Sequence, residues 1–230
     1  EIYTSIDTLS LHDALPITVA SFIVAPLSGM ALARVQARYL MAAGLVLTGV
    51  GLLLMSGLQM DSEWTALLAG FLISGIGVGL LNPVIADVAL SVVPKEQSGM
   101  AAGINDTFRQ VGIAVGIAAW GAIFLGAGAD RAQETSGGAL TNDQARGLVE
   151  ATSSGHLGQA VSSLPAGLQS TASNAAQQGF LHGLNEILVL GAILSFLGGV
   201  LALWLVREGD IERETLEGTA FEAEAEPAQA

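Results

Sequence analysis

Charged and amide side chains beside apolar stretches are the residues of this sequence that can do chemistry. Asp87 closes one long apolar stretch, and Asp106, Arg109 and Gln110 lie together before the next one. A carboxylate among apolar residues must pair with a cation, reach water or take up a proton. Asp87 is therefore interpreted either as a group that exchanges protons or binds cations, or as an acid hydrated at the edge of an apolar layer.

Asp106 and Arg109 are three residues apart, so they share one face if this segment is a helix. Gln110 lies beside them, and they can pair with each other or with the earlier loop that carries Arg34 and Arg38. One interpretation is a charged gate that stabilises one of two conformations. The other is a set of side chains whose stems lie on apolar surface while their charges reach water.

The elements that must position these groups are long apolar runs without Asp, Glu, Lys, Arg or His. These runs are residues 39–58, 66–86, 111–129 and 187–206. A helix needs about 20 residues to cross about 30 Å of hydrocarbon, and a soluble helix of that length would carry a polar face. We therefore expect an all-α, polytopic membrane helical bundle. Residues 18–129 would hold a truncated helix and three full ones, and residues 181–207 would hold the last.

Glycine pairs and one proline indicate where these helices pack or bend. The pairs with a spacing of four residues are Gly75 with Gly79 and Gly112 with Gly116. Small residues at this spacing let helix backbones approach closely, either as tight packing or as sliding contacts. Asn82 and Pro83 interrupt the second run. Because proline cannot donate the hydrogen bond to the carbonyl of Gly79, this position is a hinge or a tolerated kink.

The basic residues predict how the helices are oriented. Six of the eight lie at three sites that face one side when the apolar runs alternate in direction. These six are Arg34, Arg38, Lys95, Arg109, Arg207 and Arg213. The positive-inside rule assigns that side to the cytoplasm of a plasma (inner) membrane, with the C-terminus cytoplasmic. Residues 130–180 would then be an extracytoplasmic loop, which we expect to be a poorly ordered, partly helical cap with a short helix near 143–149.

The two ends of the chain differ from the apolar body. Residues 208–230 hold eight acidic residues and one basic residue, so we expect an acidic, disordered cytoplasmic tail. Residues 1–17 contain the stretch LSLHDALPI, which resembles the translation of a short-read sequencing adaptor. We expect these residues to be an adaptor-derived artefact, with a genuine N-terminal loop as the alternative.

The densest pattern is VP-x-E-x-x-G-x-A-x-G-x-N-x-T-x-R-Q-x-G, over residues 93–112. With the apolar runs around it, this pattern resembles the C-terminal part of a major facilitator superfamily transporter, of the fourteen-helix drug:proton antiporter branch. A weaker match is PLSGMALARVQARYLM, where Arg34 and Arg38 fit the family's loop pattern G-x-x-x-D-R-x-G-x-R and Ala33 replaces its acid. The resemblance covers residues 18–213 and implies helices ten (truncated) to fourteen of such a transporter.

The resemblance implies a secondary active transporter, with proton-coupled efflux of drugs or other small amphipathic compounds. Its partners would be the small-molecule substrate, protons, the lipid bilayer and the missing N-terminal half of the transporter, so we expect the fragment to be inactive alone. The alternative is a non-transporting membrane scaffold or receptor, which only the long loop 130–180 favours. We expect no nucleic-acid partner, enzyme activity, cofactor or metal site, because no motif for any of them occurs.

Overall fold

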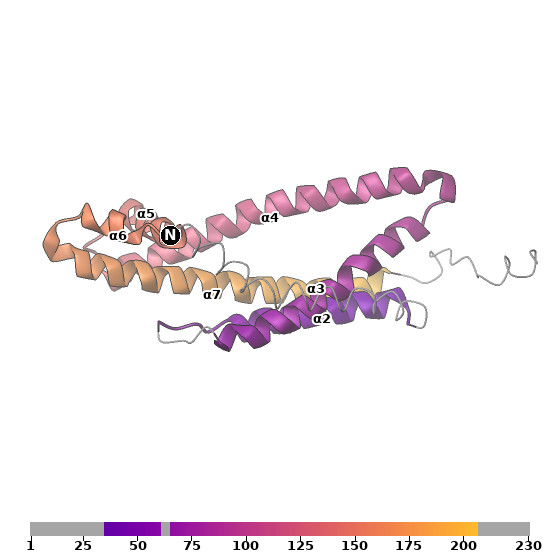
Figure 1. The fold of residues 1–230 in the computed structure, drawn as a ribbon, viewed down its shortest axis with the longest axis horizontal. Coiled ribbons are helices and arrows are strands. Elements are labelled where there is room, and N and C mark those ends of the chain that lie inside the picture. Colours follow the sequence, from indigo (N-terminus) through magenta and orange to yellow (C-terminus); the bar gives the residue numbers. More distant parts are fainter. Residues whose placement is uncertain (1–34, 61–64, 207–230) are drawn as a thin grey trace, which may run out of the picture.

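A computed structural model of the chain describes residues 35–60 and 65–206. The helices there are α2 (Ala37–Met55), α3 (Thr65–Ser91), α4 (Ser98–Thr135), α5 (Asn142–Ser153), α6 (Leu157–Ser162) and α7 (Ala166–Leu205), and a 3₁₀ turn, Lys95–Gln97, precedes α4 (Figure 1). These residues contain no β-strand, which confirms the all-α prediction. The predicted truncated helix after residue 18, the adaptor-like segment and the acidic tail lie outside the described residues.

Within the described residues, four helices are long and apolar enough to cross a membrane: α2, most of α3, α4 and α7. This finding confirms the polytopic membrane bundle. α4 has 38 residues and α7 has 40, which at about 1.5 Å per residue is nearly twice the ~30 Å thickness of a hydrocarbon core. The predicted spans 111–129 and 187–206 are therefore parts of longer helices. Apolar content marks only the stretch that crosses hydrocarbon, and here polar helix-forming residues continue each helix beyond it.

Residues 130–180 form a helical cap, which agrees with the partly helical cap expected from the sequence and contains more regular helix than that expectation. They comprise the end of α4, the short helices α5 and α6, and the first part of α7. A buried core of Ala, Leu and Val side chains joins these elements, and Val149 is fully buried in it. Thr141 precedes α5 with a capping box: its Oγ1 accepts from the Gln144 N–H (3.3 Å), and its own N–H donates to Gln144 Oε1 (3.0 Å). The short helix predicted near 143–149 is confirmed within α5.

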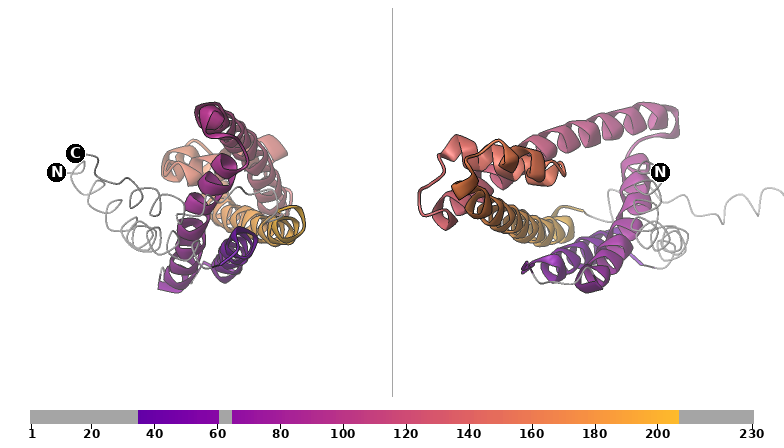
Figure 2. Two further views of the ribbon diagram at one scale, coloured as in Figure 1. Left: turned by 90° about the vertical axis from the view of Figure 1, so that its right-hand side faces the viewer. Right: turned by 60° about the vertical axis from the view of Figure 1, so that its left-hand side comes forward.

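α7 is the helix that both α2 and α4 contact. α2 packs along its C-terminal half, and α4 packs with the cap along its N-terminal half. α3 lies against α2. α4 diverges from α2 and α7 toward its own N-terminus, where the end of α3 rises to meet it (Figures 1 and 2). A buried cluster of Ala37, Leu40 and Val84, with Val206 packed against it, joins the start of α2, the second half of α3 and the end of α7. These three segments share one end of the bundle, which is consistent with the orientation that the basic residues predict.

Close backbone contact at glycines holds α2 against α3. Gly44 and Gly51 of α2 face Gly77 and Gly70 of α3, respectively. A β-carbon placed on Gly77 would lie 2.6 Å from the Gly44 carbonyl oxygen, and one on Gly51 would lie 2.7 Å from the Gly70 carbonyl oxygen. The two glycines are seven residues apart on each helix (44 to 51 and 70 to 77). They therefore form one glycine seam along an antiparallel helix pair.

The two glycine pairs singled out in the sequence lie in different surroundings. Gly75 and Gly79 are buried in α3. Gly112 and Gly116 lie on the N-terminal half of α4, where no described residue comes within 4 Å of an added β-carbon. The divergence of α4 from α2 and α7 leaves this region uncovered. A helix contact at Gly112 and Gly116 therefore stays a prediction.

α4 and α7 meet through a second set of glycines that the sequence analysis missed. A β-carbon on Gly183 would lie 2.5 Å from the Phe124 carbonyl oxygen, and one on Gly128 would lie 3.0 Å from that of Gly179. The rings of Phe124 and Phe180 pack edge to face with centroids 5.5 Å apart. These contacts join the C-terminal half of α4 to α7 beside the cap.

We expect Gly51→Ala to lower the free energy of unfolding by about 1–3 kcal/mol, because the added methyl group would overlap the backbone of α3 and force the helices apart. Gly147→Ala is the matched control, since Gly147 is an exposed glycine of α5 with nothing within 4 Å of its added β-carbon. The measurement is unfolding of the purified chain in detergent micelles. Equal losses in the two variants would contradict the glycine seam.

Candidate functional site

The predicted gate residues lie on the part of α4 that the other described helices leave exposed. Arg109 Nη2 donates to Asp106 Oδ1 at 2.5 Å, the pairing expected for residues three apart on one helix face. The Arg109 and Asp106 side chains are 57% and 56% exposed. Gln110 is exposed next to them. The structure thus places three of the predicted residues together, as an ion pair within one helix and an adjacent amide.

The same half of α4 exposes large apolar side chains. Phe108 is 74% exposed, Val115 63% and Ile117 69%. Such a surface is stable against lipid or against another apolar protein surface. Lipid or an apolar protein surface placed against these side chains would lower the dielectric constant around the charge pair, where charge interactions are stronger than in water. A helix that docks on this surface would change the energy of the pair.

Arg38 is bound by its own neighbours at the start of α2, and Arg34 lies outside the described residues. Arg38 Nε donates to Gln36 Oε1 (2.9 Å), and its Nη2 donates to the Tyr39 hydroxyl (3.1 Å). Its guanidinium carbon also lies 4.7 Å from the centre of the Tyr39 ring. Among the residues that the structure describes, Arg38 makes no ion pair with Asp106. α4 diverges from α2, so the structure does not bring these two predicted gate residues together.

Asp87 is half-buried on α3, four residues after Pro83. α3 stays helical through Pro83, and Figure 1 shows it running beside α2 before it turns toward the start of α4. The Ser91 hydroxyl donates to the backbone carbonyl of Asp87 (2.7 Å). No ion pair of the Asp87 carboxylate occurs in the described part of the chain. A role of the Asp87 carboxylate in exchanging protons or binding a cation stays a prediction, as does a hinge at Pro83 and the exposed Asn82.

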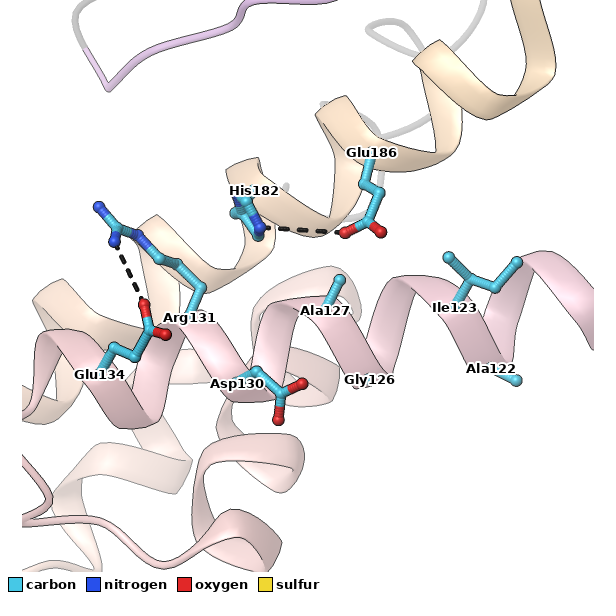
Figure 3. A pocket seen from close by; sticks show the side chains of 9 residues that line it. All are labelled: Ala122, Ile123, Gly126, Ala127, Asp130, Arg131, Glu134, His182 and Glu186. Carbon is cyan, nitrogen blue, oxygen red and sulfur yellow. Dashed lines mark hydrogen bonds and ion pairs between the residues drawn. The ribbon is translucent and has the colours of Figure 1, made fainter. Parts of the chain in front are cut away.

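A groove at the cap end gathers charged residues that the sequence analysis did not bring together. It has a volume of about 430 Å³ and lies between α4 and α7 (Figure 3). Its charged lining residues are Asp130, Arg131, Glu134, His182 and Glu186. Arg131 Nη1 pairs with Glu134 Oε2 at 3.5 Å, and His182 Nε2 lies 3.9 Å from Glu186 Oε2, a contact that is an ion pair only with a protonated imidazole. Each pair lies within one helix, and no group of three metal-binding side chains occurs in the described residues.

One amide on α7 makes contacts that the sequence analysis also missed. Asn185 Oδ1 accepts from the backbone N–H groups of Gly57 (3.0 Å) and Leu58 (3.0 Å). Asn185 Nδ2 donates to the Leu58 carbonyl oxygen (2.9 Å). These backbone atoms belong to the loop that follows α2. The sequence shows only that an amide side chain lies close to an apolar run. It does not show the contact, because Asn185 binds backbone N–H and C=O groups, which occur in nearly every residue.

We expect Arg109→Ala to change the free energy of unfolding of the chain by less than about 1 kcal/mol, because an exposed ion pair contributes little to stability. Arg131→Ala is the matched control, since Arg131 also pairs with an acid three residues away on α4. The measurement is unfolding in detergent micelles. A loss of more than about 2 kcal/mol in Arg109→Ala alone would show that Arg109 makes further contacts.

A family model and several known proteins resemble this chain. The model of the Major Facilitator Superfamily matches residues 1–129. The chain is 28% identical to the multidrug efflux pump LfrA of Mycolicibacterium smegmatis over 182 residues, which are 77% of this chain and 35% of that protein. It is 37% identical to the multidrug resistance protein Stp of Mycobacterium tuberculosis over 109 residues, 47% of this chain and 20% of that protein.

A third relative is a probable actinorhodin transporter of Streptomyces coelicolor. It is 30% identical over 153 residues, which are 59% of this chain and 26% of the relative. The chain thus spans about a third or less of the length of these relatives. No solved structure matches the chain significantly.

Proposed function

The chain belongs to the Major Facilitator Superfamily, and we propose on that premise that it is part of a secondary transporter that exports drugs or other small amphipathic compounds in exchange for protons. The observation that carries the proposal is the similarity to relatives named as a multidrug efflux pump and a multidrug resistance protein. Four described helices of membrane length and apolar composition agree with it.

We propose that the transporter lies in the plasma (inner) membrane with its C-terminus cytoplasmic. The support is the end of the bundle where the start of α2, the second half of α3 and the end of α7 meet. Arg38 lies at this end, and in the sequence further basic residues precede α2, follow α3 and follow α7. Positive charge marks the cytoplasmic side of membrane proteins. The helical cap would then lie on the opposite side of the membrane.

The proposed mechanism distinguishes helices that stay in contact from a helix surface that changes partners. A transporter that alternates between two states needs helices that stay together and surfaces that change partners. Glycine contacts join α2 to α3 and α4 to α7, whereas the N-terminal half of α4 carries an exposed ion pair, Asp106 with Arg109. A pair that gains or loses ~1.4 kcal/mol on docking would shift the two states tenfold. We assign the gate to this pair and the proton to the Asp87 carboxylate, which is half-buried.

Efflux from cells that express the complete gene tests the proposed function. We expect these cells to expel a fluorescent cationic dye, and we expect a protonophore to abolish the expulsion because the proton gradient drives it. Cells that carry the empty vector are the control. Equal dye retention with and without the protein would contradict the proposal and favour the non-transporting scaffold, and efflux that survives the protonophore would contradict proton coupling.

Asp87→Asn and Arg109→Ala test the assigned roles in the same assay at matched membrane abundance. We expect Asp87→Asn to alter the pH dependence of efflux, since it keeps the shape of the side chain and removes its proton exchange. We expect Arg109→Ala to lower efflux about tenfold through the gate equilibrium. Asp143→Asn and Arg146→Ala, exposed residues of α5, are the matched controls. Wild-type behaviour of either test variant would withdraw the role assigned to that residue.

A further inference from the structure

We propose that Asn185 is a latch that fixes the loop after α2 to α7, so that α2, α3 and α7 move as one unit. Its side-chain amide makes three hydrogen bonds of 2.9–3.0 Å to the backbone of Gly57 and Leu58. The amide oxygen has two acceptor positions, and both are occupied. One amide thus binds two successive peptide units of a loop more than 120 residues away in the sequence.

The end of α2 presents two successive backbone N–H groups to Asn185. The N–H of Ser56 still donates to a helix carbonyl, that of Leu52, at 3.1 Å. Gly57 then adopts a φ of +84°, a left-handed conformation that glycine takes without strain. The two N–H groups that follow Ser56, those of Gly57 and Leu58, point to Asn185. The Gly57 bond is exposed and the Leu58 bond is part-buried. Asn185 thus supplies the acceptor for the two N–H groups that continue the end of α2 and fixes their position against α7.

Asn185 lies between the part of α7 that packs against α4 and the part that packs against α2. On its N-terminal side, Gly179 and Gly183 lie against the backbone of α4. On its C-terminal side, an added β-carbon on Gly191 would lie 3.2 Å from Leu52 of α2. The latch therefore joins the end of the α2–α3 hairpin to the junction of the two contact zones. Motion of α7 with α4 and the cap is passed to α2 and α3 at this point as well as through the contact of α2 with the C-terminal half of α7. Asn185 is therefore a positioning residue.

Hydrogen exchange of the complete gene product in detergent micelles tests the latch without reference to transport. We expect Asn185→Ala to speed exchange of the Gly57 and Leu58 amides about tenfold or more, because local opening no longer breaks hydrogen bonds. Asn185→Asp keeps the acceptor and loses the donor. In this variant the exchange rates of the Gly57 and Leu58 amides should fall between those of the wild type and of Asn185→Ala. Asn174→Ala is the matched control: Asn174 lies on the same helix, is exposed, and makes no side-chain hydrogen bond to the described residues. Unchanged exchange at Gly57 and Leu58 in Asn185→Ala would overturn the latch.

The second readout rests on the proposed function and separates positioning from mere stability. At matched membrane abundance, we expect Asn185→Ala to lower the maximal rate of dye efflux about tenfold and to leave the half-saturating dye concentration unchanged. Asn185→Asp should recover part of the rate. Lost protection with a wild-type rate would overturn the positioning role. If the wild-type protein moves no dye, the proposed function fails, and hydrogen exchange still decides whether the latch exists.

Discussion

Contact between helix backbones, made possible by glycine, is the interaction on which the other features of this bundle depend. In a membrane, burial of apolar side chains gives little advantage over lipid, so helices associate through close van der Waals contact. Gly51 against Gly70 and Gly128 against Gly179 bring backbone atoms of two helices to distances that no larger residue permits. These contacts decide which helix surfaces are closed and which stay open.

The cap shares in one of these contacts. A β-carbon on Gly128 would meet Val149 Cγ1 of α5 at 3.0 Å, and one on Gly179 would meet Val149 Cγ2 at the same distance. The side chain of Val149 therefore fills the space beside the contact of Gly128 of α4 with Gly179 of α7. The aliphatic core of the cap and this glycine contact are continuous, so α5 of the cap packs against both α4 and α7.

The charges of the described helices contribute little to holding the helices together. The ion pairs found there are Arg109 with Asp106, Arg131 with Glu134 and, when its imidazole is protonated, His182 with Glu186. Each of them joins residues three or four apart on one helix, and each is substantially exposed. Such pairs change stability little. They can therefore respond to a new neighbour without unfolding the bundle, a property that a gate requires.

Local properties of the sequence determined the membrane helices, the all-α class, the family resemblance and the Asp106–Arg109 pair, because an uncharged run or a spacing of three residues is complete within one segment. The capping box at Thr141 is local in the same way. The tertiary structure alone decided that Gly44 faces Gly77, that α4 leaves its N-terminal half exposed, and that Asn185 binds the loop after α2. These contacts join segments far apart in the chain through backbone atoms that all residues share. No pattern of side chains in the sequence records them.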